Sequence, residues 1–312
     1  MPKVAIITPT YNRDRLLPKT MVGVARQNYD DYVHIIVDDA STDDTPQVVG
    51  NFTEFYPTSG HVKYVRRERT SEQVLGASAA RNRGIKTLSE FPDVKYVTFF
   101  DDDDILAQGS LRCRVEALDA NSEIRLVYGY LAVCTEDMRV YDICKGPNTN
   151  DPREIPQYII QYHDRGFPSL AIMFRREFLD DLGGYDVALG HGEDLDFSIR
   201  AFNALKRGQF LRLPRKIFYY RKHEGGMCQH NSQDDDIITR QRAIFNNRHG
   251  ITPIEEGLSG LRRFATRPHT FLPEPIKAAL RPLRNRFSRN IGHIDPFVAE
   301  IERDVDKMLS RT

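Results

Sequence analysis

A short apolar run that ends abruptly in four acids constrains the fold most strongly. Residues 97–100 read Val-Thr-Phe-Phe, and residues 101–104 are all Asp. Such a run is typical of a buried strand, and acids at its carboxyl end would lie where open α/β sheets bind ligands. Water, Lys or Arg side chains, or a hard cation such as Mg²⁺ or Mn²⁺ must neutralise this charge. An acidic loop that caps a helix beginning near Gln108 is the plainer alternative.

Strand and helix patterns alternate along the rest of the chain. The spacing of apolar residues predicts strands at 4–8, 34–37, 62–65, 96–100, 126–133, 171–174, 210–213 and 217–220. It predicts helices at 16–25, 41–49, 77–88 and 111–118 and from Glu193 onward, and a loop at 141–155. This alternation favours a mostly parallel sheet with helices on both faces, so the loops after Thr8, Val37 and Phe100 should open at one edge.

Composition excludes several other classes of protein. The 44 basic and 44 acidic residues balance, so overall charge gives no reason to expect nucleic-acid binding. The four cysteines show no Cys-x-x-Cys spacing, which favours a reducing cytoplasm over a zinc site or a disulfide framework. The first residues lack the pattern of a signal peptide, and no run approaches the ~18 apolar residues of a membrane span. We therefore expect a cytoplasmic protein that would meet a membrane only peripherally, on its inner face.

Three more motifs fall at predicted element boundaries. They are Thr8-Pro9-Thr10-Tyr11-Asn12-Arg13, Val37-Asp38-Asp39-Ala40-Ser41 and Gly192-Glu193-Asp194-Leu195-Asp196. Together with the acid run, and in this order, they resemble glycosyltransferase family 2, whose members are inverting enzymes that use nucleotide sugars. The resemblance extends over about residues 3–230. It implies the GT-A fold, a mostly parallel mixed sheet flanked by helices, with a Rossmann-like nucleotide-binding half.

The resemblance assigns the acid run to the donor diphosphate and ribose. Asp103 would bind Mn²⁺ or Mg²⁺, while Asp101 or Asp102 would contact the ribose and Asp104 would support them. Asp39 would accept the N3–H of uracil, a proton that cytosine lacks, so a UDP-sugar is the expected donor. As an alternative, Asp39 is a turn residue.

Five other residues match donor-side elements of the family. Pro9, Tyr11 and Arg13 stand in the first loop, where Tyr11 offers a flat face to the base and Arg13 can reach phosphate. Arg81 and Asn82 belong to the sequence Ala-Ala-Arg-Asn-Arg-Gly, which matches another element near the donor. Tyr11 packing at a loop corner and a solvated Arg81 are the alternatives.

On the acceptor side, the resemblance makes Asp194 the catalytic base. An inverting transfer needs a base to remove the proton of the acceptor hydroxyl as its oxygen attacks the anomeric carbon. Glu193 and Asp194 also fit the first turn of a helix, where the dipole favours carboxylates, so capping is the alternative. His223 resembles a histidine that several family members place near the metal or the diphosphate, and His230 is a competing candidate.

We therefore predict a metal-dependent glycosyltransferase domain at 1–250, with a donor half at 1–106 and an acceptor half at 107–250. The acceptor would be a carbohydrate or lipid-linked hydroxyl, in polysaccharide, cell-envelope or glycoconjugate synthesis. One alternative is a nucleotidyltransferase, which would usually carry a Gly-rich basic loop after the first strand. The other is a non-catalytic sugar-nucleotide-binding subunit of a polysaccharide-assembly complex, which would be expected to lose Asp103 or Asp194.

The last segment, 251–312, is predicted to be a basic, amphipathic extension. Between positions 257 and 290, eight Lys or Arg residues accompany a single acid, Glu274, and apolar residues fall on one helical stripe. Residues 262–291 could thus contact an anionic membrane, or pack on the catalytic domain or on a second copy in a homo-oligomer. Pro282 argues against one unbroken helix.

Overall fold

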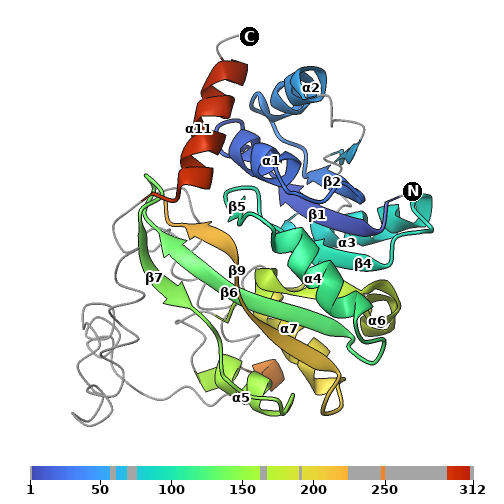
Figure 1. Ribbon diagram of the computed structural model, residues 1–312. Helices are drawn as coiled ribbons and strands as arrows, with labels where there is room; N and C mark the ends of the chain where they lie inside the picture. Colours follow the sequence, from blue (N-terminus) through green and yellow to red (C-terminus); the bar gives the residue numbers. More distant parts are fainter. Residues whose placement is uncertain are drawn as a thin grey trace, which may run out of the picture.

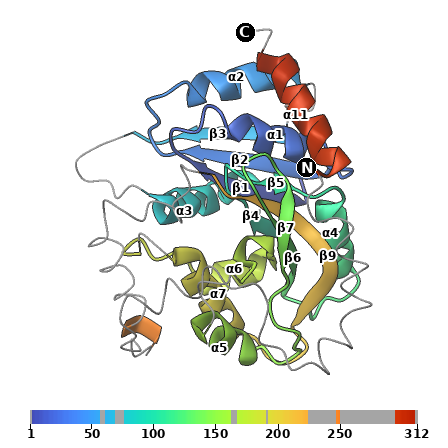
Figure 2. The ribbon, with the colours of Figure 1, turned by 90° about the vertical axis from the view of Figure 1, so that its left-hand side faces the viewer.

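The computed structural model describes residues 2–56, 61–68, 76–161, 167–189, 192–223, 247–249 and 294–309. These residues form a nine-stranded sheet with helices on both sides (Figures 1 and 2). The strands are β1 Val4–Thr10, β2 Tyr32–Asp38, β3 Val62–Arg66, β4 Tyr96–Phe99, β5 Ile105–Leu106, β6 Leu126–Cys134, β7 Val140–Cys144, β8 Met173–Arg175 and β9 Phe210–Arg221. The helices are α1 Leu17–Ala25, α2 Thr45–Phe55, α3 Ala77–Thr87, α4 Ser110–Asp119, α5 Glu154–Gln161, α6 Arg176–Leu182, α7 Glu193–Asn203 and α11 Pro296–Leu309, with 3₁₀ turns η2 Leu88–Glu90 and η4 Ser169–Ala171.

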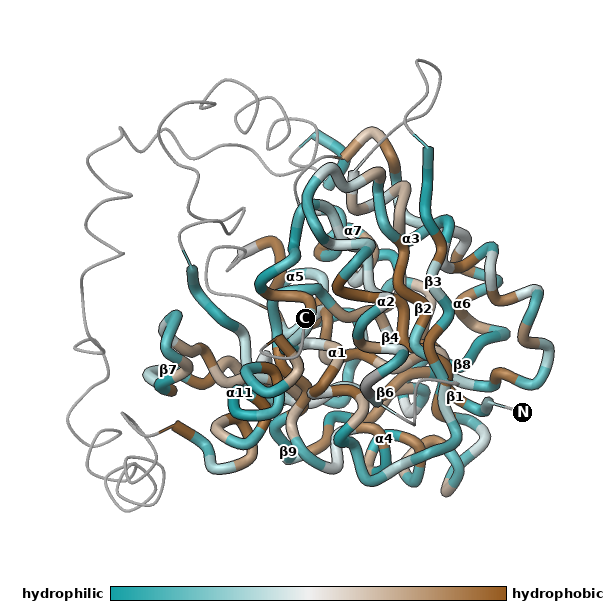
Figure 3. Tube along the Cα trace, turned by 90° about the horizontal axis from the view of Figure 1, so that it is seen from above, coloured by the Kyte–Doolittle hydropathy of each residue, from teal (hydrophilic) through white to brown (hydrophobic). Residues whose placement is uncertain are grey.

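The first half of the sheet is parallel, in the order β3-β2-β1-β4. All seven residues of β1 are buried, and apolar segments run through the middle of the molecule in Figure 3. Helix α3 lies close against β1, because Gly84 occupies a place where any Cβ would overlap the Ile7 side chain. Pro9, which has no N–H, lies beyond Ile7, the last β1 residue paired with β4. These four strands all end at one edge of the sheet.

The second half of the sheet is mixed. β8 pairs antiparallel with both β4 and β6, β9 runs parallel to β6, and β5 and β7 are antiparallel to their neighbours. The α/β prediction is thus confirmed, with parallel pairing throughout the first four strands and again between β6 and β9. In this order β5, directly after the acid run, lies beside the end of β9.

Two local predictions were wrong in the second half. Residues 141–155 are not a loop throughout, because a turn at Thr135–Arg139 with Met138 in a left-handed conformation sends the chain back as β7, and α5 begins at Glu154. The strands predicted at 210–213 and 217–220 are one strand, β9, which continues past Pro214 through shifts in its register with β6.

Helix α11 packs on the first half of the molecule, beside α1 (Figure 1). Its apolar stripe enters the core formed by α1, α2 and β5. The buried residues of this stripe are Phe297, Val298, Ile301, Val305 and Met308. Burying each such side chain stabilises the fold by about 1.5–3 kcal/mol. The last part of the predicted tail is therefore helical. Residues 262–291, where the helical stripe was predicted, lie outside the described residues. No helix in the described part of the chain has the length and apolarity needed to cross a membrane.

Candidate active site

The loops after β1, β2 and β4 meet at the edge where the parallel strands end. The Asn12 N–H donates to Ser41 Oγ over 2.9 Å, which joins the first loop to the second. Arg13 Nε lies 3.4 Å from Asp102 Oδ1, which joins the first loop to the acid run. Tyr11 is 41% exposed at this edge. The structure thus brings together three segments that the sequence placed at strand ends.

Asp39 lies buried beneath this edge. The Gly76 N–H donates to its Oδ2 over 2.6 Å, and its Oδ1 forms a close ion pair with Arg67. Arg67 directly follows β3, so the fourth parallel strand also contributes to the site. A carboxylate has about four lone-pair sites, so Asp39 keeps the capacity to accept one further N–H.

Each aspartate of the acid run has a different partner. Asp101 Oδ1 pairs with Arg81 over 2.7 Å, and Asp103 Oδ2 lies 3.0 Å from His223 Nε2. Asp104 is fully buried and accepts the Arg221 N–H over 3.0 Å. That bond fixes the end of β9 two residues before His223. Asp103 and His223 therefore lie side by side, and Asp104 holds the end of β9 near them. Their binding of a metal stays a prediction.

Burial gives these acids an unusual affinity for protons. It raises the pKa of Asp101 to about 6, and it raises the pKa of Asp102, which is also repelled by Asp103, to about 7. Such a site favours a positive ligand.

Carboxylate oxygen and imidazole nitrogen, as in Asp103 and His223, suit Mn²⁺. No group of three or more acid, His or Cys side chains gathers around one point in the described residues. Two protein ligands with substrate phosphates are a usual arrangement for such cations, so these residues fit one.

Arg81 connects the acid run to α7. It is 2% exposed, and it bonds Asp101 through Nη2 and Glu193 Oε1 through Nη1, each over 2.7 Å. Burial alone would lower its pKa, but Asp101 and Glu193 raise the pKa of Arg81 well above its ordinary value. The solvated alternative is thereby excluded. Arg81 is a permanent cation between the two acids.

Asn82, the neighbour of Arg81, holds the loop before α7. Its Nδ2 donates to the Tyr185 carbonyl over 2.8 Å, and its Oδ1 accepts the Tyr185 N–H over 2.7 Å. The Tyr185 ring stacks on Phe197 of α7, with 4.3 Å between ring centroids. Asn82 is thus engaged by protein atoms, and its contact with the donor stays a prediction.

Asp194 lies in the first turn of α7 and is partly buried. Gly192, with φ of 74°, starts the helix in a conformation that glycine adopts at low cost. The Ser169 hydroxyl donates to Asp194 Oδ2 over 2.6 Å. Burial and the neighbouring Glu193 raise the pKa of Asp194, whereas the Ser169 bond and Arg81 lower it. A carboxylate with a raised pKa suits a base that works near neutrality.

Sequence reasoning missed several contributors to this cluster. Ser169 carries no local signal, since a single serine before a strand is common. Arg67 had a signal, because it stands at the end of a strand as Asp39 and Asp101 do. His230 lies outside the described residues, so it stays an untested alternative to His223.

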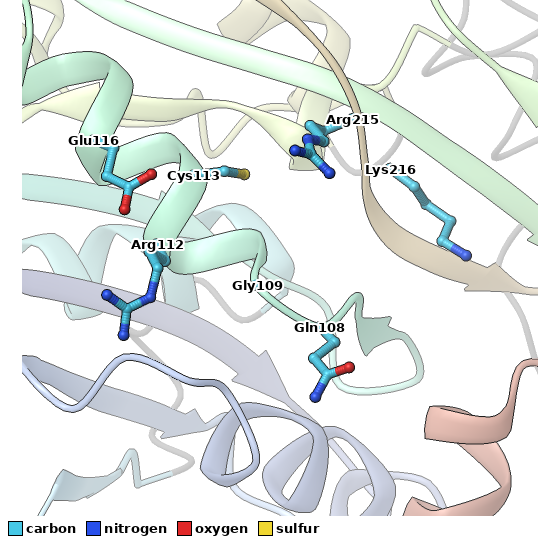
Figure 4. A pocket seen from close by; sticks show the side chains of 7 residues that line it. All are labelled: Gln108, Gly109, Arg112, Cys113, Glu116, Arg215 and Lys216. Carbon is cyan, nitrogen blue, oxygen red and sulfur yellow. The ribbon is translucent and has the colours of Figure 1, made fainter.

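A separate hollow of about 210 Å³ lies between α4 and β9 (Figure 4). In the figure, Cys113 of α4 and Arg215 of β9 point toward each other across it, while Lys216 points away. The predicted site residues line none of it. Their cluster, not this hollow, is therefore the candidate active site.

Comparison with known proteins identifies the family. The model of the family Glycosyl transferase family 2 matches residues 5–183, more than half of the chain. The chain belongs to this family. It is 33% identical over 129 residues to the GalNAc(5)-diNAcBac-PP-undecaprenol beta-1,3-glucosyltransferase of Campylobacter jejuni, a match that covers 41% of the chain but only 38% of that relative. An uncharacterized glycosyltransferase of Haemophilus influenzae is 27% identical over 256 residues, covering 81% of the chain and 79% of the relative.

Solved structures of glycosyltransferases share the fold of this family member. Residues 1–349 of S. aureus TarS, in complex with UDP-GlcNAc, superpose with a TM-score of 0.55 at 21% identity, covering 81% of the chain and 68% of TarS. The mannosyltransferase PcManGT from Pyrobaculum calidifontis, in complex with GDP-Man and Mn²⁺, gives 0.53 at 20% identity, covering 99% and 79%. The GT-A fold predicted from the motifs is confirmed by this likeness.

Proposed function

We propose that this protein is an inverting glycosyltransferase that moves a sugar from a UDP-sugar to an acceptor hydroxyl. One observation carries the proposal. Arg81 bonds Asp101 after β4 and Glu193 beside Asp194, so it joins the proposed donor acids to the proposed base. Residues 1–106 would supply the donor side, and residues 107–250 the acceptor side. A transfer between the two sides requires the donor acids and the base to lie in one cluster, and the bonds of Arg81 support this.

The donor side rests on the loops after β1 and β2. Asp39 would accept the uracil N3–H while keeping its bonds to Arg67 and Gly76, and Tyr11 would lie against the base. Arg13, already 3.4 Å from Asp102, is a suitable partner for a phosphate. Asp101 or Asp102 would contact the ribose. TarS in complex with UDP-GlcNAc supports a uridine donor, whereas PcManGT binds GDP-Man, so the choice of base depends on this chain's Asp39.

Asp103 and His223 would hold Mn²⁺ or Mg²⁺. When bound, the cation supplies positive charge that stabilises the leaving diphosphate. Asp194 would remove the proton from the acceptor hydroxyl, because it is a partly buried carboxylate whose pKa is raised by burial. The new bond then forms opposite the departing diphosphate, which inverts the anomeric centre.

The decisive experiment compares chemistry with binding in Asp194→Asn. Turnover should fall by a factor on the order of a hundred or more, while the Kd for UDP with Mn²⁺ changes less than about twofold. The donor is found by screening UDP-sugars for UDP release, and the anomeric configuration by NMR. Asp180→Asn, on the exposed face of α6, is the control and should act like wild type. Normal turnover in Asp194→Asn, with loss in Glu193→Gln, would instead give the base to Glu193.

The acceptor is proposed to be a carbohydrate or lipid-linked hydroxyl. The Campylobacter relative is named as acting on an undecaprenol-linked saccharide, which supports this class. Residues 262–291 would then contact anionic lipid through their basic side chains. Replacing Arg281, Arg284, Arg286 and Arg289 by Gln should abolish flotation with anionic liposomes. Equal flotation of both proteins, or of neither, would contradict this membrane contact.

A further inference from the structure

Ser169 fixes the carboxylate of Asp194 from the sheet side. It belongs to η4, immediately before β8, and β8 lies between β4 and β6. The Thr98 hydroxyl of β4 donates to the Ile172 carbonyl over 2.8 Å, which ties this turn to the central sheet. The Ser169 hydroxyl is therefore held by a rigid element and not by a free loop.

The hydroxyl of Ser169 has one proton and two acceptors within reach. Asp194 Oδ2 lies at 2.6 Å and the Phe167 carbonyl at 3.3 Å. The shorter distance and the negative charge both favour the carboxylate, because hydrogen bonds to ionised acceptors are shorter and stronger. Ser169 therefore donates to Asp194, and the bond fixes the rotation of the carboxylate.

Charged groups on α7 itself and on two other segments face the same carboxylate. Glu193 on α7 and Asp101 after β4 are acids, while Arg81 on α3 is a cation that bonds both. The charge of Asp194 also helps to raise the pKa of Tyr185, in the loop before α7. Burial and the charge of Glu193 raise the pKa of Asp194, whereas the Ser169 bond and Arg81 lower it. Without the serine, the balance moves toward the protonated, inactive form.

We propose that Ser169 is a positioning residue of the transfer reaction, which holds the Asp194 carboxylate as an anion turned toward the acceptor hydroxyl. This inference rests on the proposed role of Asp194 as the base. Ser169 itself touches neither the donor nor the reacting atoms in this scheme.

The test is Ser169→Ala beside a matched control, Ser198→Ala. Ser198 is a buried serine of α7 whose hydroxyl donates to the main-chain carbonyl of Asp194 over 2.9 Å, not to the carboxylate. Ser169→Ala should lower kcat about tenfold to a hundredfold, the usual range for a hydrogen bond to a charged group, with donor KM unchanged. Ser198→Ala should stay within about threefold of wild type. The acid limb of the kcat–pH profile should move to higher pH only in Ser169→Ala, because the pKa of the base rises.

A double-mutant cycle separates positioning from general damage. In an Asp194→Asn background, Ser169→Ala should cause no further loss, because the group it acts through is gone. Additive losses, or equal kcat and pH profiles for the two alanine variants, would overturn the inference. Should Ser169→Ala fail to fold, Ser169→Cys replaces it, since a thiol is a weak donor of similar shape and predicts the same loss. Full turnover in Asp194→Asn would contradict the role of Asp194 as the base. If Asp194→Asn loses turnover as expected but Ser169→Ala keeps wild-type kcat, only the role of Ser169 is overturned.

Discussion

At the scale of single residues, the four adjacent aspartates differ because their neighbours differ. Asp101 faces Arg81, Asp102 faces Arg13, Asp103 faces His223, and Asp104 is buried against the end of β9. The sequence shows four adjacent acids without a local difference, so it left open which of Asp101 and Asp102 would contact the ribose. Asp103 and His223 lie 120 positions apart in the sequence, and only the resemblance to a family could predict their pairing. Ser169 lay beyond prediction, because its role depends on a contact across the fold.

The metal assignment predicts that UDP binds weakly without a divalent cation. The diphosphate and the acid run repel each other until a cation lies between them. Mn²⁺ should therefore tighten UDP binding to wild type by at least about tenfold, and Asp103→Asn should abolish that response. Titration calorimetry with Mn²⁺ or with EDTA measures both. Asp137→Asn, in an exposed turn, should keep the wild-type response. UDP binding that is equal in EDTA would show the assignment to be wrong.

At the scale of elements, β1, β2 and β4 were predictable because each is a buried apolar run closed by polar residues. β7 and α5 were not, since their polar and Pro-containing sequence also suits a loop and only pairing with β6 fixes the strand. β9 was divided in the prediction at Pro214, where tertiary pairing overrides a local signal for a break. Tertiary contacts therefore decide the elements of the second half.

His34 of β2 should make stability depend on pH. It is 1% exposed, its Nε2 lies 2.9 Å from the Thr8 hydroxyl, and burial lowers its pKa to about 3. The unfolded chain binds a proton below about pH 6.5, but the folded chain does not, so stability is full above pH 6.5 and falls as pH drops toward 3. Between pH 7.5 and 5.0, His34 should account for a loss of about 2 kcal/mol. In urea unfolding, the free energy of unfolding of His34→Gln should fall between pH 7.5 and 5.0 by about 2 kcal/mol less than that of wild type. Identical losses in both proteins would contradict it.

At the scale of the whole molecule, α11 and α1, which are far apart in the sequence, pack into the same hydrophobic core. α11 follows the family match, which ends at residue 183, by more than a hundred residues. It nevertheless packs on α1 and is tied there by Arg26, which pairs with Glu300 and Asp304 over 2.6 and 2.8 Å. Sequence reasoning separated residues 251–312 at a change in composition, and that division stays a prediction. Composition could not show which surface α11 covers.

This packing predicts that a single apolar side chain of α11 stabilises the first half of the fold. Ile301 is fully buried, and a Cβ on Gly23 of α1 would lie 3.6 Å from it and 3.3 Å from Ile105. Ile301→Ala should lower the free energy of unfolding by about 2–5 kcal/mol, because it leaves a cavity between α1, α11 and β5. Arg303→Ala, on the exposed face of the same helix, should change it by less than about 0.5 kcal/mol. Urea midpoints measure both. Because Ile105 directly follows the acid run, Ile301→Ala should also weaken UDP binding with Mn²⁺. Equal free energies of unfolding for Ile301→Ala and Arg303→Ala would show that α11 is not part of the core.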